Sequence, residues 1–227
     1  MINRYATNKV DKRKKYILVF DCETACGLKN PVIYDKGWTI IDKQGNIYEK
    51  RSYVIEEIFN DDAFMATAYY KKKIPMYWEK IKAGEMLMKP WAYARAVLMN
   101  DIEHYGVTQF SAYNLGFDLG ALENTAKELP TRGYWSYFNP KVMAKLEFVD
   151  IWTLACQTIL QQKTFHSLAL ENGWYNKKTG NHKTNAEVAF RYITSEHDFK
   201  EEHTALSDCI IESAILAKCY RQKKKIV

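Results

Sequence analysis

Two acidic residues, Asp21 and Glu23, end a short apolar segment near the start of the chain, KYILVFDCET at 15–24. On a β-strand, residues two positions apart point to the same face, with Cβ atoms about 6.5–7 Å apart. Two carboxylates so placed repel each other unless a positive charge lies between them, and a hard divalent cation supplies that charge. An exposed strand end could also carry two acids, but the apolar residues before the pair are typical of a central strand. The segment therefore predicts one side of a metal site.

A third acid, Asp118, lies in the segment SAYNLGFDLGAL, where a short strand breaks at Asn114 and a helix follows. Acidic residues are common in the first turn of a helix because they complement its dipole. Capping alone could therefore explain Asp118, and a metal ligand is the alternative.

The segment EEHTALSDCIIES contains the last pair of candidates, His203 and Asp208. Thr204 can cap a helix whose first turn carries Asp208, which places His203 in the loop before that helix. Two residues five apart converge more easily when one lies in the loop and the other in the helix. Taken alone, His203 would be a capping or surface histidine.

These candidates need a scaffold, and the hydrophobic pattern predicts one. Three strands come first and are expected to be antiparallel, because the polar KQGN between the second and third is a hairpin turn. Alternating helices and strands follow, and helices end the chain, which favours a layered α/β domain. The expected strands are 15–21, 32–42, 46–55, 108–114 and 146–151, and the main expected helices are 90–105, 116–129, 165–173, 184–194 and 204–222.

The composition fits one soluble domain over residues 1–227, with basic tails at 1–15 and 221–227 and a net charge of +6. No apolar run approaches the ~20 residues of a membrane span, and the polar N-terminus is unlike a secretory signal. The five cysteines form no CxxC pair, which favours a reduced, cytoplasmic setting over a disulfide framework or a zinc site.

Residues 56–89 are expected to form a helical insertion that is rich in Met, Tyr and Lys. Its segments AYYKKK and MYWEK interleave aromatic residues with lysines. Single-stranded nucleic acid is bound by such a mixture, with bases on rings and phosphates on lysines. The alternative, slightly favoured here, is a helix that packs its aromatic residues on the sheet and turns its lysines outward.

The acidic motifs, taken in order, resemble those of the DEDDh branch of the DnaQ-like 3'–5' exonuclease family. The family's D-x-E motif corresponds to FDCET, with Asp21 and Glu23. Its second motif corresponds to YNLGFD, with Asp118, and its H-x-A-x-x-D motif to HTALSD, with His203 and Asp208. A D-x-E alone is common by chance, whereas three motifs in order are not, and together they cover most of the chain.

The resemblance implies an RNase H-like fold: a mixed five-stranded sheet with its first three strands antiparallel and helices on its faces. It also implies two divalent cations, Mg²⁺ or Mn²⁺, held by Asp21, Glu23, Asp118 and Asp208. Such a pair, ~3.5–4 Å apart, can activate a water and stabilise the leaving oxygen of a phosphodiester. His203 would then be the general base, since an imidazole with a pKa near ~6.5 suits that role at neutral pH.

The same resemblance suggests a set of substrate-binding residues. Thr24 would hold the terminal nucleotide through its backbone, and Asn114 and Phe117 would line the same pocket. Cys22 alternates away from the acidic face of its strand, so it is expected to point away from the metal ions.

The implied activity is metal-dependent 3'–5' exonucleolytic hydrolysis at a single-stranded 3' end, with release of nucleoside monophosphates. DNA is favoured over RNA as the substrate, and a polymerase acting in trans is a candidate partner. An RNA-trimming 3'–5' exoribonuclease is the first alternative. A non-catalytic RNase H-like module that only binds nucleic acid, or an RNase H-fold endonuclease, is less favoured, because all five motif residues are intact and the H-x-A-x-x-D spacing is present.

Overall fold

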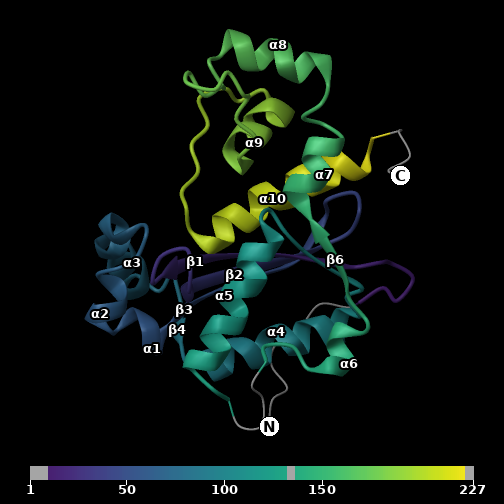
Figure 1. Cartoon of the computed structure of the whole chain (residues 1–227). Helices are drawn as coiled ribbons and strands as arrows, with labels where there is room; N and C mark the ends of the chain where they lie inside the picture. The colour runs from purple at the N-terminus through teal and green to yellow at the C-terminus, as the bar shows by residue number, and fades with distance from the viewer. Residues whose placement is uncertain (1–9, 132–135, 223–227) are drawn as a thin grey trace.

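The structure, a computed structural model, describes residues 10–131 and 136–222, and a six-stranded mixed sheet lies at its centre (Figure 1). Most of the two predicted basic tails lies outside these residues, at 1–9 and 223–227. The order across the sheet is β4-β3-β2-β1-β5-β6. The strands are β1 (Ile17–Ala25), β2 (Val32–Ile41), β3 (Ile47–Ile55), β4 (Met88–Lys89), β5 (Gln109–Ala112) and β6 (Glu147–Asp150).

The strand directions confirm the predicted RNase H-like arrangement. Strands β1, β2 and β3 pair antiparallel, whereas β5 pairs parallel with β1 and β6 parallel with β5. The predicted count of five strands was one too low, because Met88 and Lys89 pair parallel with the end of β3. A two-residue strand is too short to produce a periodic pattern, so the sequence showed no sign of it.

The predicted hairpin between β2 and β3 forms around Asp42. The Asp42 carboxylate accepts hydrogen bonds from the backbone N–H groups of Gln44 and Asn46, at 3.0 and 3.1 Å. Gly45 has a φ of +88°, a conformation that costs glycine little and other residues more. This turn brings β3 back along β2 and fixes their register.

The helices follow the predicted order. They are α1 (Glu56–Phe59), α2 (Asp62–Met65), a 3-10 helix (Lys71–Lys73), α3 (Ile74–Lys82), α4 (Trp91–Tyr105), α5 (Leu115–Glu128), α6 (Pro140–Met143), α7 (Ile151–Gln157), α8 (Lys163–Glu171), α9 (Ala186–Thr194) and α10 (Ala205–Tyr220). None of the described helices is both long and apolar enough to cross a membrane.

Helices cover both faces of the sheet and bury nearly all of β1, β2 and β5, whereas β3 and β6 are partly exposed. Helices α7 to α10 lie on one face and α4 to α6 on the other (Figure 1). Alternate residues of β1 join the two cores: Ile17 and Val19 pack with α10, whereas Leu18 and Phe20 pack with α4 and α5. The period-2 alternation of the strand therefore decides which helix each β1 side chain meets.

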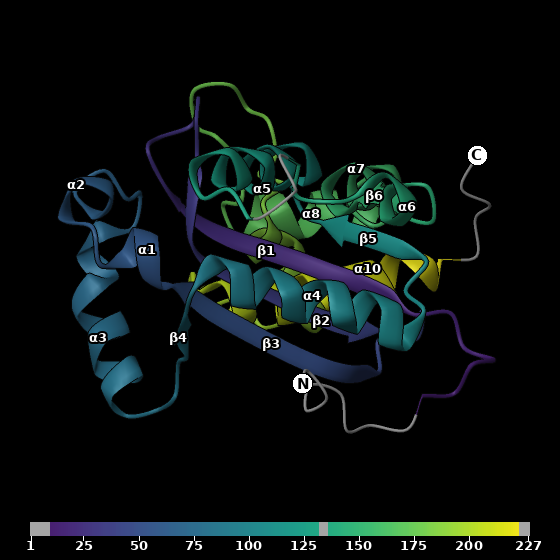
Figure 2. The same cartoon turned by 90° about the horizontal axis from the view of Figure 1, so that it is seen from below.

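The segment predicted as a helical insertion, 56–89, forms the short helices α1 to α3 and the edge strand β4. These helices lie together beyond one end of the long strands (Figure 2). Tyr77 of α3 is buried there, and its hydroxyl donates to the Asp35 carboxylate of β2 at 2.8 Å. The segment is thus packed onto the end of the sheet.

Candidate metal centre

The end of β1 carries the first two acids toward α10. Asp21 and Glu23 continue the face of β1 on which Ile17 and Val19 pack against α10. Glu23 is buried and Asp21 is partly exposed. The predicted alternation of this strand is therefore present, and it directs both carboxylates to one side of the sheet.

Helix α10 reaches these acids because it begins directly on β2. Gly37 of β2 pairs with Asp21 of β1. A Cβ atom at Gly37 would lie 2.7 Å from the Ala205 carbonyl carbon and from the Leu206 nitrogen, so only glycine admits the first turn of α10 here. The neighbouring Asp35 accepts a hydrogen bond from the Ala205 N–H at 3.1 Å, which anchors that turn.

The first turn of α10 supplies Asp208. Thr204 precedes the helix as predicted, and its N–H donates to Ser207 Oγ at 3.3 Å. Asp208 is buried and joins the β1 acids: one carboxylate oxygen from each of Asp21, Glu23 and Asp208 lies within 4.8 Å of the others. Two segments far apart in the sequence, β1 and the start of α10, thus meet at one point.

The acids of this cluster are hard to ionise together. Burial and the nearby carboxylates of Glu212, Asp118 and Glu23 raise the pKa of Asp21 well above its usual range. Burial and the Asp208 carboxylate raise the pKa of Glu23 to about 9, and burial raises that of Asp208 to about 6. Protons or a bound cation must therefore offset the repulsion among these groups.

Asp118 approaches from the other side of β1. It lies in the first turn of α5, is buried, and accepts a hydrogen bond from the Cys22 thiol at 3.3 Å. Burial, with a contribution from Asp150, raises its pKa to about 7. Asp118 is outside the 4.8 Å group, although its charge contributes to the raised pKa of Asp21.

The contact of Cys22 with Asp118 modifies one expectation. Cys22 does point to the face of β1 opposite the two acids, where it packs with the α4 and α5 core. It nevertheless contacts a predicted metal ligand, because α5 places Asp118 on that face. Sequence alternation alone could not show which helix would bring an acid to the cysteine side.

Asp150 ends β6 and lies directly before α7. Its carboxylate accepts hydrogen bonds from the N–H of Thr153 at 2.6 Å and from that of Leu115 at 3.0 Å. The first bond caps α7 and the second anchors the start of α5, three residues before Asp118. Asp150 therefore helps to position Asp118.

His203 lies in the loop before α10, as predicted, in a left-handed conformation with φ of +51°. Its Nδ1 is 3.8 Å from Asp208 Oδ2 and 3.5 Å from Glu201 Oε2. Tyr70 stacks on the imidazole, with ring centroids 4.6 Å apart and an interplanar angle of 15°. Burial and the positive charge of Lys73 lower the pKa of His203.

Two acids that sequence reasoning missed also belong to this region. Glu212 is buried, one turn beyond Asp208 on α10, and its Oε2 has no hydrogen-bond partner among the described residues. Burial and the Asp118 carboxylate raise its pKa well above the usual range. Glu201 forms a second three-residue group with His203 and Asp208, and burial raises its pKa to about 8. The i, i+4 spacing of Asp208 and Glu212 was the available signal.

The three predicted substrate-binding residues lie on two elements. Thr24 is buried near the end of β1, and its carbonyl accepts a hydrogen bond from the Tyr69 N–H at 3.4 Å. Asn114 precedes α5 and is exposed, whereas Phe117 lies in the first turn of α5 and is half-buried. Their role in binding a nucleotide stays a prediction.

The donor set fits hard divalent cations. All the clustered ligands are carboxylates, which Mg²⁺ and Mn²⁺ prefer over softer donors. The Oε2 atom of Glu212 is buried without a described partner, and the pKa values of the clustered acids are raised. Asp21, Glu23 and Asp208 would hold such ions, with Asp118 approaching from α5.

Comparison with solved structures relates this geometry to known proteins. E. coli Exonuclease I in complex with a 5cy-dT13 oligonucleotide superposes with a TM-score of 0.54, at 15% identity, over 88% of this chain and 39% of that one. Exonuclease I from Methylocaldum szegediense gives 0.55, at 13% identity, over 92% and 41%. The zinc-bound form of the E. coli Exonuclease I–ssDNA complex gives 0.50, at 14% identity, over 88% and 39%.

This chain has the RNase H-like fold of Exonuclease I. It spans about 40% of the length of those proteins. No protein-family model and no curated protein sequence matches it. The similarity therefore identifies the fold, and the arguments for an activity rest on the side chains described above.

Proposed function

We propose that the chain is a metal-dependent 3'–5' exonuclease of the DEDDh type, acting on single-stranded DNA ends. The observation that carries the proposal is the convergence of Asp21, Glu23, Asp208 and His203. These residues come from β1 and from the start of α10 with the loop before it, which are far apart in the sequence. The proposal is supported by the shared fold of Exonuclease I structures that are described as complexes with ssDNA.

In this proposal each residue has a distinct task. Two Mg²⁺ or Mn²⁺ ions, when bound, would activate a water and stabilise the oxygen that leaves the cleaved phosphodiester. The carboxylates of Asp21, Glu23 and Asp208 would orient those ions, and Asp118 would complete the set. His203 would accept the proton of the attacking water, because its lowered pKa keeps the imidazole neutral at neutral pH.

The test is hydrolysis of a 5'-labelled single-stranded oligodeoxynucleotide with Mg²⁺ or Mn²⁺. Shortening from the 3' end, with release of nucleoside monophosphates and complete inhibition by EDTA, is expected. Asp208→Asn should abolish this activity, whereas the matched change Asp198→Asn, at an exposed acid, should not alter it. Undiminished activity of Asp208→Asn would overturn the assignment of the site.

Two further substrates separate the alternatives. Faster cleavage of a ribo-oligonucleotide of the same sequence would favour the exoribonuclease. Cleavage of a circular single strand, which has no 3' end, would instead indicate an endonuclease. Binding without hydrolysis of any of these substrates would favour the non-catalytic module.

A further inference from the structure

The short segment Tyr69–Lys73 of the 56–89 region lies beside the candidate metal centre. The Tyr69 N–H donates to the carbonyl of Thr24, the residue after Glu23. Tyr70 stacks on His203, and the Lys73 ammonium lies 5.1 Å from the centre of the Tyr70 ring. Lys73 also donates to the Glu202 carbonyl, and its positive charge partly offsets the rise in the pKa of Glu23 and of Asp208. The segment therefore borders the cluster on the side of His203.

The aromatic residues of this region divide into two kinds. Tyr77 is buried and packs its ring against Tyr34 and Phe59, which is the structural role favoured from the sequence. Tyr69 is different, because 76% of it is exposed. Its ring meets that of Tyr70 edge-on, with centroids 4.8 Å apart at 89°. Tyr70 thus supports the Tyr69 ring, and most of the Tyr69 side chain stays open to solvent.

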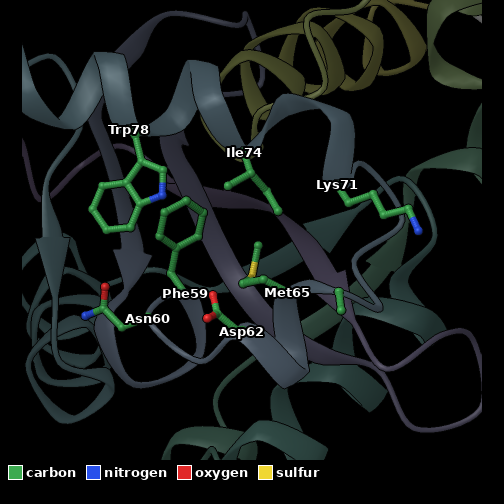
Figure 3. Close-up of a pocket in the computed structure, with 8 residues that line it drawn as sticks. Phe59, Asn60, Asp62, Met65, Lys71, Ile74 and Trp78 are labelled. Atoms are coloured by element: carbon green, nitrogen blue, oxygen red, sulfur yellow. The ribbon is translucent and has the colours of Figure 1, made fainter.

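The three lysines of this segment also differ in their exposure. Lys73 is half-buried and bonded to Glu202, whereas Lys71 and Lys72 are exposed. Lys71 also lines a cavity of about 420 Å³ between α1, α2 and α3. Figure 3 shows its ammonium extending away from the apolar side chains of Phe59, Met65 and Trp78. Two exposed lysines therefore follow the exposed Tyr69 by two and three residues, in the segment whose Tyr70 stacks on His203.

We propose that Tyr69, Lys71 and Lys72 form the binding site for the nucleotides just upstream of the scissile bond of a single strand. The Tyr69 ring stacks a base, and the two lysines contact phosphates. Because a cluster of carboxylates repels a polyanion, cations beside it are needed to hold the strand near the metal centre. Stacking needs an unpaired base, so this site selects single-stranded over duplex ends. The inference rests on the proposed function.

Binding is measured first, in EDTA, by fluorescence anisotropy with a labelled single-stranded oligodeoxynucleotide, so that no cleavage occurs. Tyr69→Ala is expected to weaken binding by about 5- to 150-fold, the range for loss of one aromatic stacking partner. Tyr69→Phe keeps the ring and should restore most of the affinity. The double variant Lys71→Ala/Lys72→Ala should lower the salt dependence of log Kd by up to about 1.4, since each phosphate contact on a single strand contributes about 0.7.

Lys141→Ala/Lys145→Ala is the matched control. Both lysines are exposed at or just after α6, which both views place far from α3 (Figure 1, Figure 2). This control should leave the affinity and the salt dependence unaltered. An equal loss in the control, or unaltered oligonucleotide binding by Tyr69→Ala, would overturn the inference.

Hydrolysis then separates the inference from the proposed function. A p-nitrophenyl ester of thymidine 5'-monophosphate has no nucleotide upstream of its scissile bond. Tyr69→Ala should therefore lower kcat/KM for the oligonucleotide by a larger factor than for the ester. Equal losses on both substrates would show that Tyr69 acts through Tyr70 and His203, and would refute the upstream site. If the unaltered protein hydrolysed neither substrate, the proposed function would fail, while the anisotropy measurement would still decide whether the segment binds a single strand.

Discussion

Replacing Gly37 with alanine is expected to separate the two halves of the carboxylate cluster. The added Cβ would lie 2.7 Å from two backbone atoms of Ala205 and Leu206 and 2.8 Å from a third. Ordinary contacts of a Cβ begin at 3.4 Å, so the start of α10 would have to move by about 0.7 Å. Backbone atoms cannot escape by changing rotamer, so the first turn of the helix must move as a unit and carry Asp208 with it.

This displacement has two measurable consequences. Forcing one extra methyl group into such a site destabilises a fold by about 1–3 kcal/mol, which urea denaturation would report as a lower midpoint. A misplacement on the order of 1 Å in a catalytic site can lower a rate by about 10²-fold. We therefore expect Gly37→Ala to lower oligonucleotide hydrolysis by about 10- to 100-fold and to weaken Mn²⁺ binding in calorimetric titration.

Gly120→Ala is the matched control for this change. Gly120 lies within α5, and apart from its own helix backbone and chain neighbours, a Cβ there would meet no atom of the described residues within 4 Å. Alanine is favoured over glycine in a helix by about 0.5–1 kcal/mol, so this variant should be more stable than the parent and retain its Mn²⁺ affinity. If Gly37→Ala matched the parent in both stability and Mn²⁺ affinity, the close approach of α10 to β2 would not be what positions Asp208.

Three further outcomes are expected. Because the pKa of Glu23 is raised to about 9 and that of Asp118 to about 7, the folded state binds protons more tightly than the unfolded one. The metal-free protein should therefore lose stability as pH rises from about 4 toward 9, and Glu23→Gln should make that loss smaller. Mn²⁺ should raise Tm more at pH 8.5 than at pH 5.5. A metal-free Tm that rises over this pH range would contradict the pKa shifts. Asp35→Asn should lower the free energy of unfolding in urea by about 1–3 kcal/mol, because the Ala205 N–H and the buried Tyr77 hydroxyl lose a charged acceptor; wild-type stability would contradict the anchoring role. His203→Asn should lower turnover by about 10²- to 10⁴-fold while calorimetry shows Mn²⁺ still bound, and loss of both would indicate a structural role instead.

Much of the fold could be predicted from local patterns. The apolar segment of β1 and the polar turn before β3 each specify their element through a few neighbouring residues. The order of strands and helices then restricted the topology to a mixed sheet with helices on both faces. The strand β4 was missed because its two residues pair only by virtue of a tertiary contact with β3.

The site residues that belong to the sequence motifs could be predicted, and those outside the motifs could not. Asp21 and Glu23 share a face because strand geometry requires it, and His203 precedes the helix of Asp208 because Thr204 starts that helix. Glu201 lies outside the motifs, so its place beside His203 could not be predicted. Its backbone is held by α9, where the Glu187 carboxylate accepts a hydrogen bond from the Glu201 N–H at 3.0 Å.

The sequence by itself determined which groups are available and in what local geometry: paired acids on a strand, an acid at the start of α5, and a histidine before α10. Only the tertiary structure decided which of them meet. The absence of a side chain at Gly37 lets α10 pack directly on β2, which brings Asp208 close to β1. On the opposite face of β1, the Cys22 thiol donates a hydrogen bond to Asp118. The 56–89 segment places Tyr70 on His203 across more than a hundred residues of chain. These contacts depend on the packing of elements distant in sequence, which no local pattern of residues encodes.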